Sequence, residues 1–149
     1  MTEFLEGNGV PYRNIRHSAA FKSADIAESV HRDRHNFAKT VVVVIDGEMA
    51  LVVVPASARL VLPELRDMFQ TTHVRLATED EFADVFPDCA LGAMPPFGNL
   101  YGLAIYVEAS LAEQPEIAFN AGTHTEVITM AYADFDRLVH PLLLESITV

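Results

Sequence analysis

The clearest pattern along the chain is a pair of apolar, β-branched runs separated by a turn. The first run covers residues 40–45 and the second covers 49–54, and Asp46-Gly47 between them is typical of a hairpin turn. Neither run shows the alternation of a half-exposed strand, so we expect both strands in the middle of a sheet covered on both faces. Pro55 is expected to end the second strand, because proline cannot donate to the ladder.

Weaker patterns predict short helices and further strands around this hairpin. Thr78 and Glu81 have the spacing of a capping box, which predicts a helix start just before Phe82. The predicted helices cover residues 2–8, 24–30 (capped by Ser23), 63–69 (Leu65, Met68 and Phe69 inward), 79–86 and 133–139; the further strands cover 12–17, 74–76, 103–107, 117–120 and 127–130. There is no strict β-α-β rhythm. We therefore predict an α+β fold with a mixed, mostly antiparallel central sheet and short helices packed around it.

Length and composition restrict the class of protein. The chain has 149 residues, of which 50% are hydrophobic and 21% charged, and this fits one domain over residues 1–149. No apolar run approaches the ~20 residues that span a bilayer. The start of the chain lacks a signal-peptide pattern, and the single cysteine, Cys89, cannot form an internal disulfide. We expect a soluble, cytoplasmic protein that does not bind membranes.

The charge is strongly acidic and unevenly distributed. The formal net charge is −11, which argues against general binding of duplex DNA. Residues 1–40 contain six basic and five acidic residues, or +1, whereas the rest of the chain contains four and sixteen, or −12. Any contact with phosphate is therefore expected near the first third of the chain. The alternative is that the acidic surface only maintains solubility.

Lys39 is the first candidate for chemistry, because it stands at the entrance to the apolar strand that starts at Thr40. A lysine at such a position is costly to bury and needs a partner. Its compact ammonium suits a phosphate group. The alternative is a surface lysine whose charged end extends from the end of the strand into water.

Two glycine-containing segments further along the chain are candidates for binding a ligand. In residues 92–99, glycines allow the backbone to approach a ligand, prolines hold it rigid, and free N–H groups could bind an oxyanion. In residues 120–126, Gly122 permits a sharp turn and His124 could bind substrate, relay a proton or only bond to the backbone. Each segment alone is compatible with an ordinary connection.

Other combinations of residues do not indicate a metal, catalytic or nucleotide-binding site. His31 and His35 have the i,i+4 spacing of a zinc pair on a helix, but their segment is polar and no third ligand is evident. Cys89 has no identifiable activating base. The sequence contains no phosphate-binding P-loop, no nucleophile elbow and no dinucleotide fingerprint. We therefore predict neither a metal nor a cofactor.

Taken in order, these segments resemble the YbaK-like aminoacyl-tRNA-editing domain family. The domain occurs as the insertion domain of bacterial prolyl-tRNA synthetases and as free-standing proteins. The resemblance covers residues 3–140, and the lysine with its hairpin and the Gly-x-x-x-Pro loop are its most specific parts. The matching segments are His17, Ser23-Ala24, Phe37-Ala38-Lys39-Thr40, Val53-Val54-Pro55-Ala56, Gly92-Ala93-Met94-Pro95 and Ala121-Gly122-Thr123-His124.

The resemblance implies hydrolysis of the ester between a wrong amino acid and the 3′ end of a tRNA, typically proline tRNA. It implies that Lys39 holds the phosphate or ribose of the terminal adenosine, and that the loop from Gly92 through Pro95 and Pro96 presents backbone groups to the aminoacyl carbonyl. A water activated partly by the substrate's own 2′-hydroxyl would replace a protein base. The substrate-binding residues implied are His17, Phe37, Gly122 and His124.

His124 falls where members of the family differ, and we interpret it as a residue that shapes the pocket for the amino acid. Two alternatives remain open beside the deacylase. The first is a non-catalytic module that binds a tRNA end, a nucleotide or a synthetase such as prolyl-tRNA synthetase, which the net charge of −11 favours. The second is a structural domain without a ligand.

Overall fold

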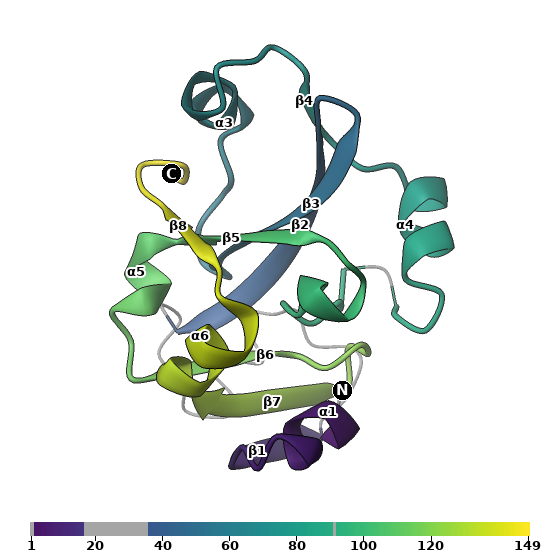
Figure 1. The fold of residues 1–149 in the computed structure, drawn as a ribbon, viewed down its shortest axis with the longest axis vertical. Coiled ribbons are helices and arrows are strands. Elements are labelled where there is room, and N and C mark those ends of the chain that lie inside the picture. Colours follow the sequence, from purple (N-terminus) through teal and green to yellow (C-terminus); the bar gives the residue numbers. More distant parts are fainter. Residues whose placement is uncertain (1, 17–35, 91) are drawn as a thin grey trace.

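The apolar runs form the centre of a mixed sheet, as their composition predicts. The computed structural model describes residues 2–16, 36–90 and 92–149. The strands form one eight-stranded sheet in the order β1-β7-β6-β2-β3-β5-β8, and β4 pairs with β2 outside this path (Figure 1). The strands are β1 (Tyr12–Arg16), β2 (Phe37–Ile45), β3 (Glu48–Pro55), β4 (Val74–Leu76), β5 (Ala104–Glu108), β6 (Glu116–Asn120), β7 (Glu126–Ala131) and β8 (Leu142–Leu144).

The pairing confirms a sheet of mixed direction. The pairs β1–β7, β2–β3, β2–β4 and β6–β7 are antiparallel. The pairs β2–β6, β3–β5 and β5–β8 are parallel. The longest pairings are antiparallel, so the sheet is mixed and mostly antiparallel as predicted, while β6 and β5 join the central hairpin in parallel.

Short helices lie around the sheet. They are α1 (Thr2–Gly7), α3 (Leu62–Met68), α4 (Glu79–Val85), α5 (Ala109–Ala112), α6 (Tyr132–Val139) and the 3-10 turn η1 (Gly98–Leu100). Helix α4 lies beside the β2–β3 hairpin, and α6 lies near β6 and β7 (Figure 1). None of the helices in the described ranges is long and apolar enough to cross a membrane.

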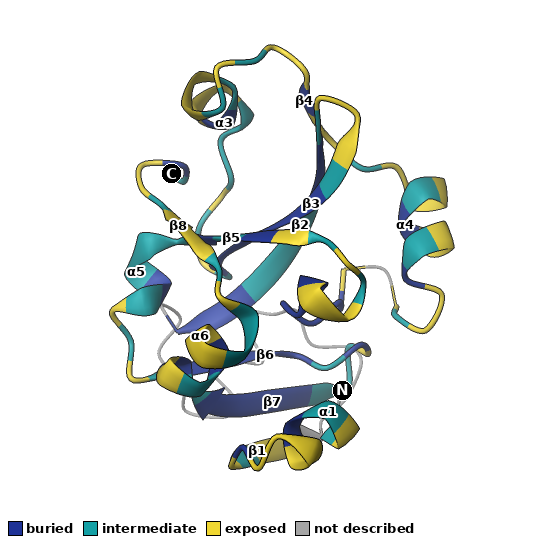
Figure 2. Ribbon diagram, in the orientation of Figure 1, coloured by how far each residue is buried: buried dark blue, intermediate teal, exposed yellow. Residues whose placement is uncertain are grey.

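Strand β2 separates two hydrophobic clusters. Ala38 and Val42 pack into the larger cluster with the aromatic rings of Phe82, Phe86 and Phe97. Val43 packs into the second cluster, which lies on the other face. Both faces of the hairpin are thus covered, as the unbroken apolar runs predict, and only the turn end of the hairpin is exposed (Figure 2).

Strand β2 has a break in pairing along one edge. Its other edge pairs with β3 from Ala38 to Ile45. The broken edge pairs with β6 at residues 37–38 and with β4 at residues 43–45, and Val42 accepts a hydrogen bond of 3.0 Å from the Ala77 amide. Within the described chain, residues 39–41 therefore have no strand beside them on this edge. The break begins at the predicted anion anchor, Lys39.

Most predicted elements are confirmed to within two or three residues, and the exceptions have local causes. The capping box of Thr78 and Glu81 is present. Met68 is wrong as an inward residue, because it is 41% exposed while Leu65 is fully buried. Helix α5 and strand β8 were not predicted, since α5 has only four residues and the three leucines of β8 lack the β-branched and aromatic side chains typical of strands. The predicted helix at 24–30 and its cap, Ser23, lie outside the described residues.

Candidate functional site

A cavity lies at the break in the sheet, between β2 and α4. Its volume is about 220 Å³, and it is lined by residues 40–42, residues 76–77, Glu79, Phe82 and Gly92. Strand β2 forms one wall, α4 another, and the glycine of the predicted ligand loop a third. We call this the β2–α4 cavity. It brings together one hydroxyl (Thr40), one carboxylate (Glu79) and a glycine backbone against apolar walls.

The predicted loop and the predicted turn are in contact. A β-carbon placed on Gly92 would lie 3.6 Å from Cε1 and 3.9 Å from Nε2 of His124, so the imidazole stands directly beside this glycine. Gly92 has φ of +80°, a conformation that glycine adopts without strain. Two backbone hydrogen bonds hold the segments together, from Gly122 N to Ala93 O at 2.9 Å and from Ala90 N to Gly122 O at 2.8 Å.

Lys39 stands at the end of the same break, next to Thr40. It is half-buried on β2 and is paired in register with Val54 of β3. Burial lowers the pKa of its ammonium, and the nearby Arg59 guanidinium lowers this pKa further. Lys39 itself is not among the residues that line the β2–α4 cavity, whereas its neighbours 40–42 are. Lys39 therefore adjoins the lining of the cavity along the backbone of β2, and its side chain is not part of that lining.

Lys39 and Arg59 together form a positive locus in an acidic protein. The ion pairs among the described residues join Arg13 to Glu116, Arg75 to Glu81 and Arg137 to Asp134, and none involves Lys39 or Arg59. Two adjacent cations, one of them half-buried, favour an anion between them. Arg59 was missed in the sequence because it follows β3 in an irregular segment, and only the fold brings it near Lys39.

The remaining predicted site residues have different surroundings. Pro95 and Pro96 are buried within the loop that follows Gly92. Phe37 is fully buried and packs with Ala118 and Val127, so its ring contributes to the core of the sheet. His17 lies outside the described residues. The predicted roles of these residues in catalysis and binding stay predictions.

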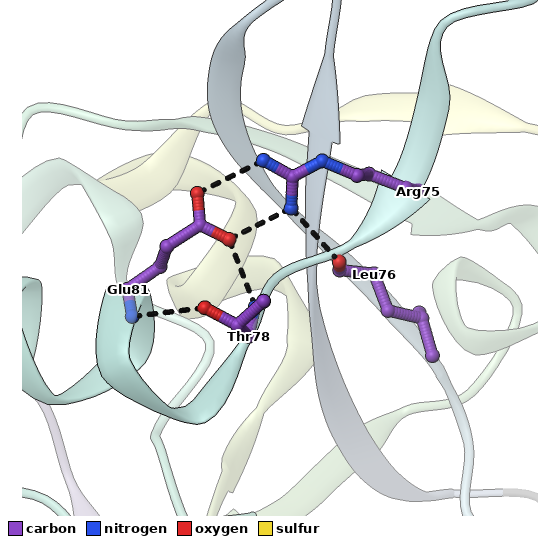
Figure 3. Close-up of polar contacts among 4 residues, drawn as sticks. All are labelled: Arg75, Leu76, Thr78 and Glu81. Carbon is purple, nitrogen blue, oxygen red and sulfur yellow. Dashed lines mark hydrogen bonds and ion pairs between the residues drawn. The ribbon is translucent and has the colours of Figure 1, made fainter.

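The α4 wall of the cavity is held in place by a local polar network. Glu81 accepts hydrogen bonds from the Arg75 guanidinium at 2.7 and 3.0 Å and from the Thr78 amide at 2.9 Å, while the Thr78 hydroxyl accepts from the Glu81 amide at 3.2 Å (Figure 3). The bond to Arg75, followed by the bonds to Thr78, lowers the pKa of Glu81 to about 2. The network fixes the start of α4, and with it Glu79, against β4.

Cys89 lies close to the turn at Gly122, and the neighbouring Tyr101 does not activate its thiol. Its sulfur is 3.6 Å from the Tyr101 hydroxyl and would lie 3.8 Å from a β-carbon on Gly122. Burial, together with Cys89, raises the pKa of Tyr101 to about 12. The phenol therefore stays protonated near neutral pH and cannot act as a base for the thiol.

A larger hollow lies at the opposite end of the hairpin. Its volume is about 500 Å³, and its polar lining includes Asp46, His73 and Arg75. It surrounds the Asp46-Gly47 turn, far along β2 from Lys39, and none of the predicted site residues lines it. We therefore take the β2–α4 cavity with its border at Lys39 as the candidate site.

Comparison with known proteins points to one family. The family model described as the aminoacyl-tRNA editing domain matches residues 17–138. The Multifunctional Ser/Thr-tRNA deacylase ProXp-y of Escherichia coli (strain K12) is 28% identical over 145 residues, covering 94% of this chain and 86% of that protein.

Solved structures show the same fold. A crystal structure of a candidate trans-editing enzyme for prolyl tRNA synthetase superimposes with a TM-score of 0.81 at 21% identity, covering 95% of this chain and 90% of that one. A crystal structure of a hypothetical protein superimposes with a TM-score of 0.85 at 17% identity, covering 99% and 98% of the two chains. Because the family model spans most of the sequence, the chain belongs to the aminoacyl-tRNA editing domain family.

Proposed function

We propose that this protein removes wrong, small amino acids from proline tRNA after they have been attached, acting as a free-standing deacylase. The enzyme class, an aminoacyl-tRNA deacylase, follows from the family. The observation that supports a site for this chemistry is the contact between Gly92 and His124 beside residues 40–42, next to Lys39. The choice of proline tRNA rests on the resemblance of the lysine, loop and turn segments to the synthetase insertion domain.

The reaction is the hydrolysis of an ester. The oxygen of a water molecule bonds to the aminoacyl carbonyl carbon, and the bond from this carbon to the 3′-oxygen of the terminal adenosine breaks. The proton from water passes to that 3′-oxygen, giving a free amino acid and an uncharged tRNA. The substrate's 2′-hydroxyl lies beside this bond and takes part in moving the proton, so no protein base is required.

The chain contributes binding and electrostatics to this reaction. Lys39 and Arg59 hold a phosphate of the terminal nucleotide, since they form a positive locus next to the β2 residues that line the cavity. The loop at Gly92 approaches the carbonyl, where backbone dipoles stabilise the oxyanion that develops. His124 stands beside Gly92 and limits the space left for the amino acid. Holding water and ester in place in this way lowers the barrier by positioning.

The test is a deacylation assay with a matrix of charged tRNAs. Proline tRNA carrying alanine, cysteine, serine or threonine is compared with proline tRNA carrying proline, and with serine and threonine on their own tRNAs. We expect at least one mischarged proline tRNA to be hydrolysed much faster than the correctly charged one. If every mischarged proline tRNA stays intact, the proposal is wrong; if serine and threonine are removed equally from their own tRNAs, its choice of tRNA is wrong.

A second candidate function is a non-catalytic module that binds the tRNA end or a synthetase. The net charge of −11 favours it, because a tRNA-binding surface normally carries an excess of basic residues. A deacylase with this charge could compensate by docking on a prolyl-tRNA synthetase that already holds the tRNA. Capture of prolyl-tRNA synthetase with and without tRNA separates the two: binding without turnover supports the module, and turnover supports the deacylase.

A further inference from the structure

The β2–α4 cavity contains one acidic side chain that the proposed reaction does not use. Glu79 lines the cavity together with Thr40, Val41, Phe82 and Gly92. Of the residues that line it, Glu79 is the only one with a charge. A carboxylate beside the approach to an ester carbonyl would repel the developing oxyanion, so its presence there calls for a positive group on the substrate.

The structure gives Glu79 no evident task in holding α4. Glu81 makes the capping box with Thr78 and the bonds to Arg75. Glu79 is exposed, and among the described residues no hydrogen bond or ion pair is assigned to it. The alternative explanation is a favourable interaction with the start of the helix, which Asp80 in the same turn shares.

The substrate carries a group that fits this carboxylate. The α-carbon of an aminoacyl ester bears a side chain and a free ammonium next to the carbonyl. If the carbonyl lies at Gly92, both substituents lie within the space between β2 and α4. Lys39 and Arg59, which do not line the cavity, repel a cation, whereas Glu79 in its lining attracts one.

We propose that Glu79 binds the free α-ammonium of the aminoacyl group and thereby restricts the enzyme to esters of unblocked α-amino acids. This inference rests on the deacylase function proposed above. The apolar wall formed by Val41 and Phe82 then receives the amino acid side chain. Esters whose α-nitrogen is acylated, or whose α-substituent is a neutral hydroxyl, lose the contact with Glu79.

The test compares two substrates that differ only in this charge. The first is the mischarged tRNA that the wild type hydrolyses fastest, and the second is the same tRNA carrying the corresponding α-hydroxy acid. The hydroxyl is no larger than the ammonium, so a steric effect is avoided. We expect Glu79→Gln to lower kcat/KM on the aminoacyl ester about three- to tenfold, as for a partly exposed charged contact, and on the hydroxyacyl ester less than about twofold.

The matched control is Asp80→Asn, which removes the same charge from the same turn of α4. Asp80 does not line the cavity, so both substrates should be hydrolysed at wild-type rates. The inference is overturned if Glu79→Gln slows both esters equally, or if Asp80→Asn shows the same selective loss. If the wild type hydrolyses neither ester, the deacylase proposal itself fails and this inference falls with it; if it hydrolyses both equally well, only this inference fails.

Discussion

At the scale of single residues, the fold determines which side chains surround Lys39. Lys39 has Val54 as its partner on β3 and Arg59 as its charged neighbour. Its sequence position, before an apolar strand, made it a candidate for binding an anion, and its role as the anchor stays a prediction that rests on the family resemblance. Arg59 could not be found in the same way, because its place beside Lys39 depends on how the chain leaves β3.

Gly98 is a residue where the backbone packs too closely for a side chain. A β-carbon there would lie 2.8 Å from Cγ1 of Ile105, 2.9 Å from the Leu103 carbonyl oxygen and 3.1 Å from Cδ1 of Leu51. The carbonyl oxygen belongs to the backbone and cannot move aside without a shift of the chain. We expect Gly98→Ala to lower the free energy of unfolding by roughly 1–3 kcal/mol, as for other overpacked sites.

Urea unfolding of the two alanine variants Gly98→Ala and Gly7→Ala measures this effect against a matched control. No atom lies within 4 Å of a β-carbon on Gly7, so Gly7→Ala should change the free energy of unfolding by less than about 0.5 kcal/mol. Equal stability of the Gly98 variant and the wild type would show that the loop can adjust, and that the close packing is not a constraint.

At the scale of elements, local signals predicted the structure well. The capping box at the start of α4 needs only two residues three positions apart, Thr78 and Glu81, and it forms as the sequence predicts. The hairpin β2–β3 follows from two β-branched runs and a two-residue turn. Strand β8 follows the left-handed residue His140 and pairs with β5 far away in the sequence, and its three leucines lack the β-branched residues that would indicate a strand.

The network at the start of α4 predicts a dependence of stability on pH. The pKa of Glu81 is about 2 in the folded protein, far below the ordinary 4.5 of a glutamate. Glu81 therefore stabilises the fold above pH 4.5, and this contribution is lost as the pH falls toward 2. We expect Glu81→Gln to lower the unfolding free energy at pH 6 and to flatten its decline below pH 4.5.

The measurement is the difference in unfolding free energy between wild type and Glu81→Gln across this pH range. Arg75→Met should have a similar effect, because Arg75 is the largest cause of the lowered pKa. A difference between wild type and Glu81→Gln that stays constant from pH 6 to pH 3 would contradict the assigned network.

At the scale of the whole molecule, the site depends on topology that the residues alone do not reveal. Strand β2 shares one edge between β6 and β4, and the break between them makes room for the cavity. The segments at residues 39, 92 and 124 could be placed in one family pattern from their order. Their adjacency could not be derived from local periodicity, because it requires two strands that are far apart in sequence to pair with the same edge.

The distribution of charge over the molecule also depends on the fold. The chain has a net charge of −11, and within its described part Lys39 and Arg59 form a positive locus. An acidic protein with a local positive locus is suited to holding one terminal phosphate and not to binding along a duplex. Substrate affinity should therefore depend on Lys39 much more than on other basic residues of similar exposure.

The most direct test of this account is the rate at which Lys39→Ala hydrolyses the mischarged proline tRNA that the wild type prefers. Loss of one charged contact to phosphate should reduce kcat/KM roughly 10- to 100-fold with little change in the unfolding temperature. Arg137→Ala removes an exposed positive charge on α6 and should hydrolyse the ester at the wild-type rate. Hydrolysis by Lys39→Ala that is as fast as that of the wild type would contradict the account.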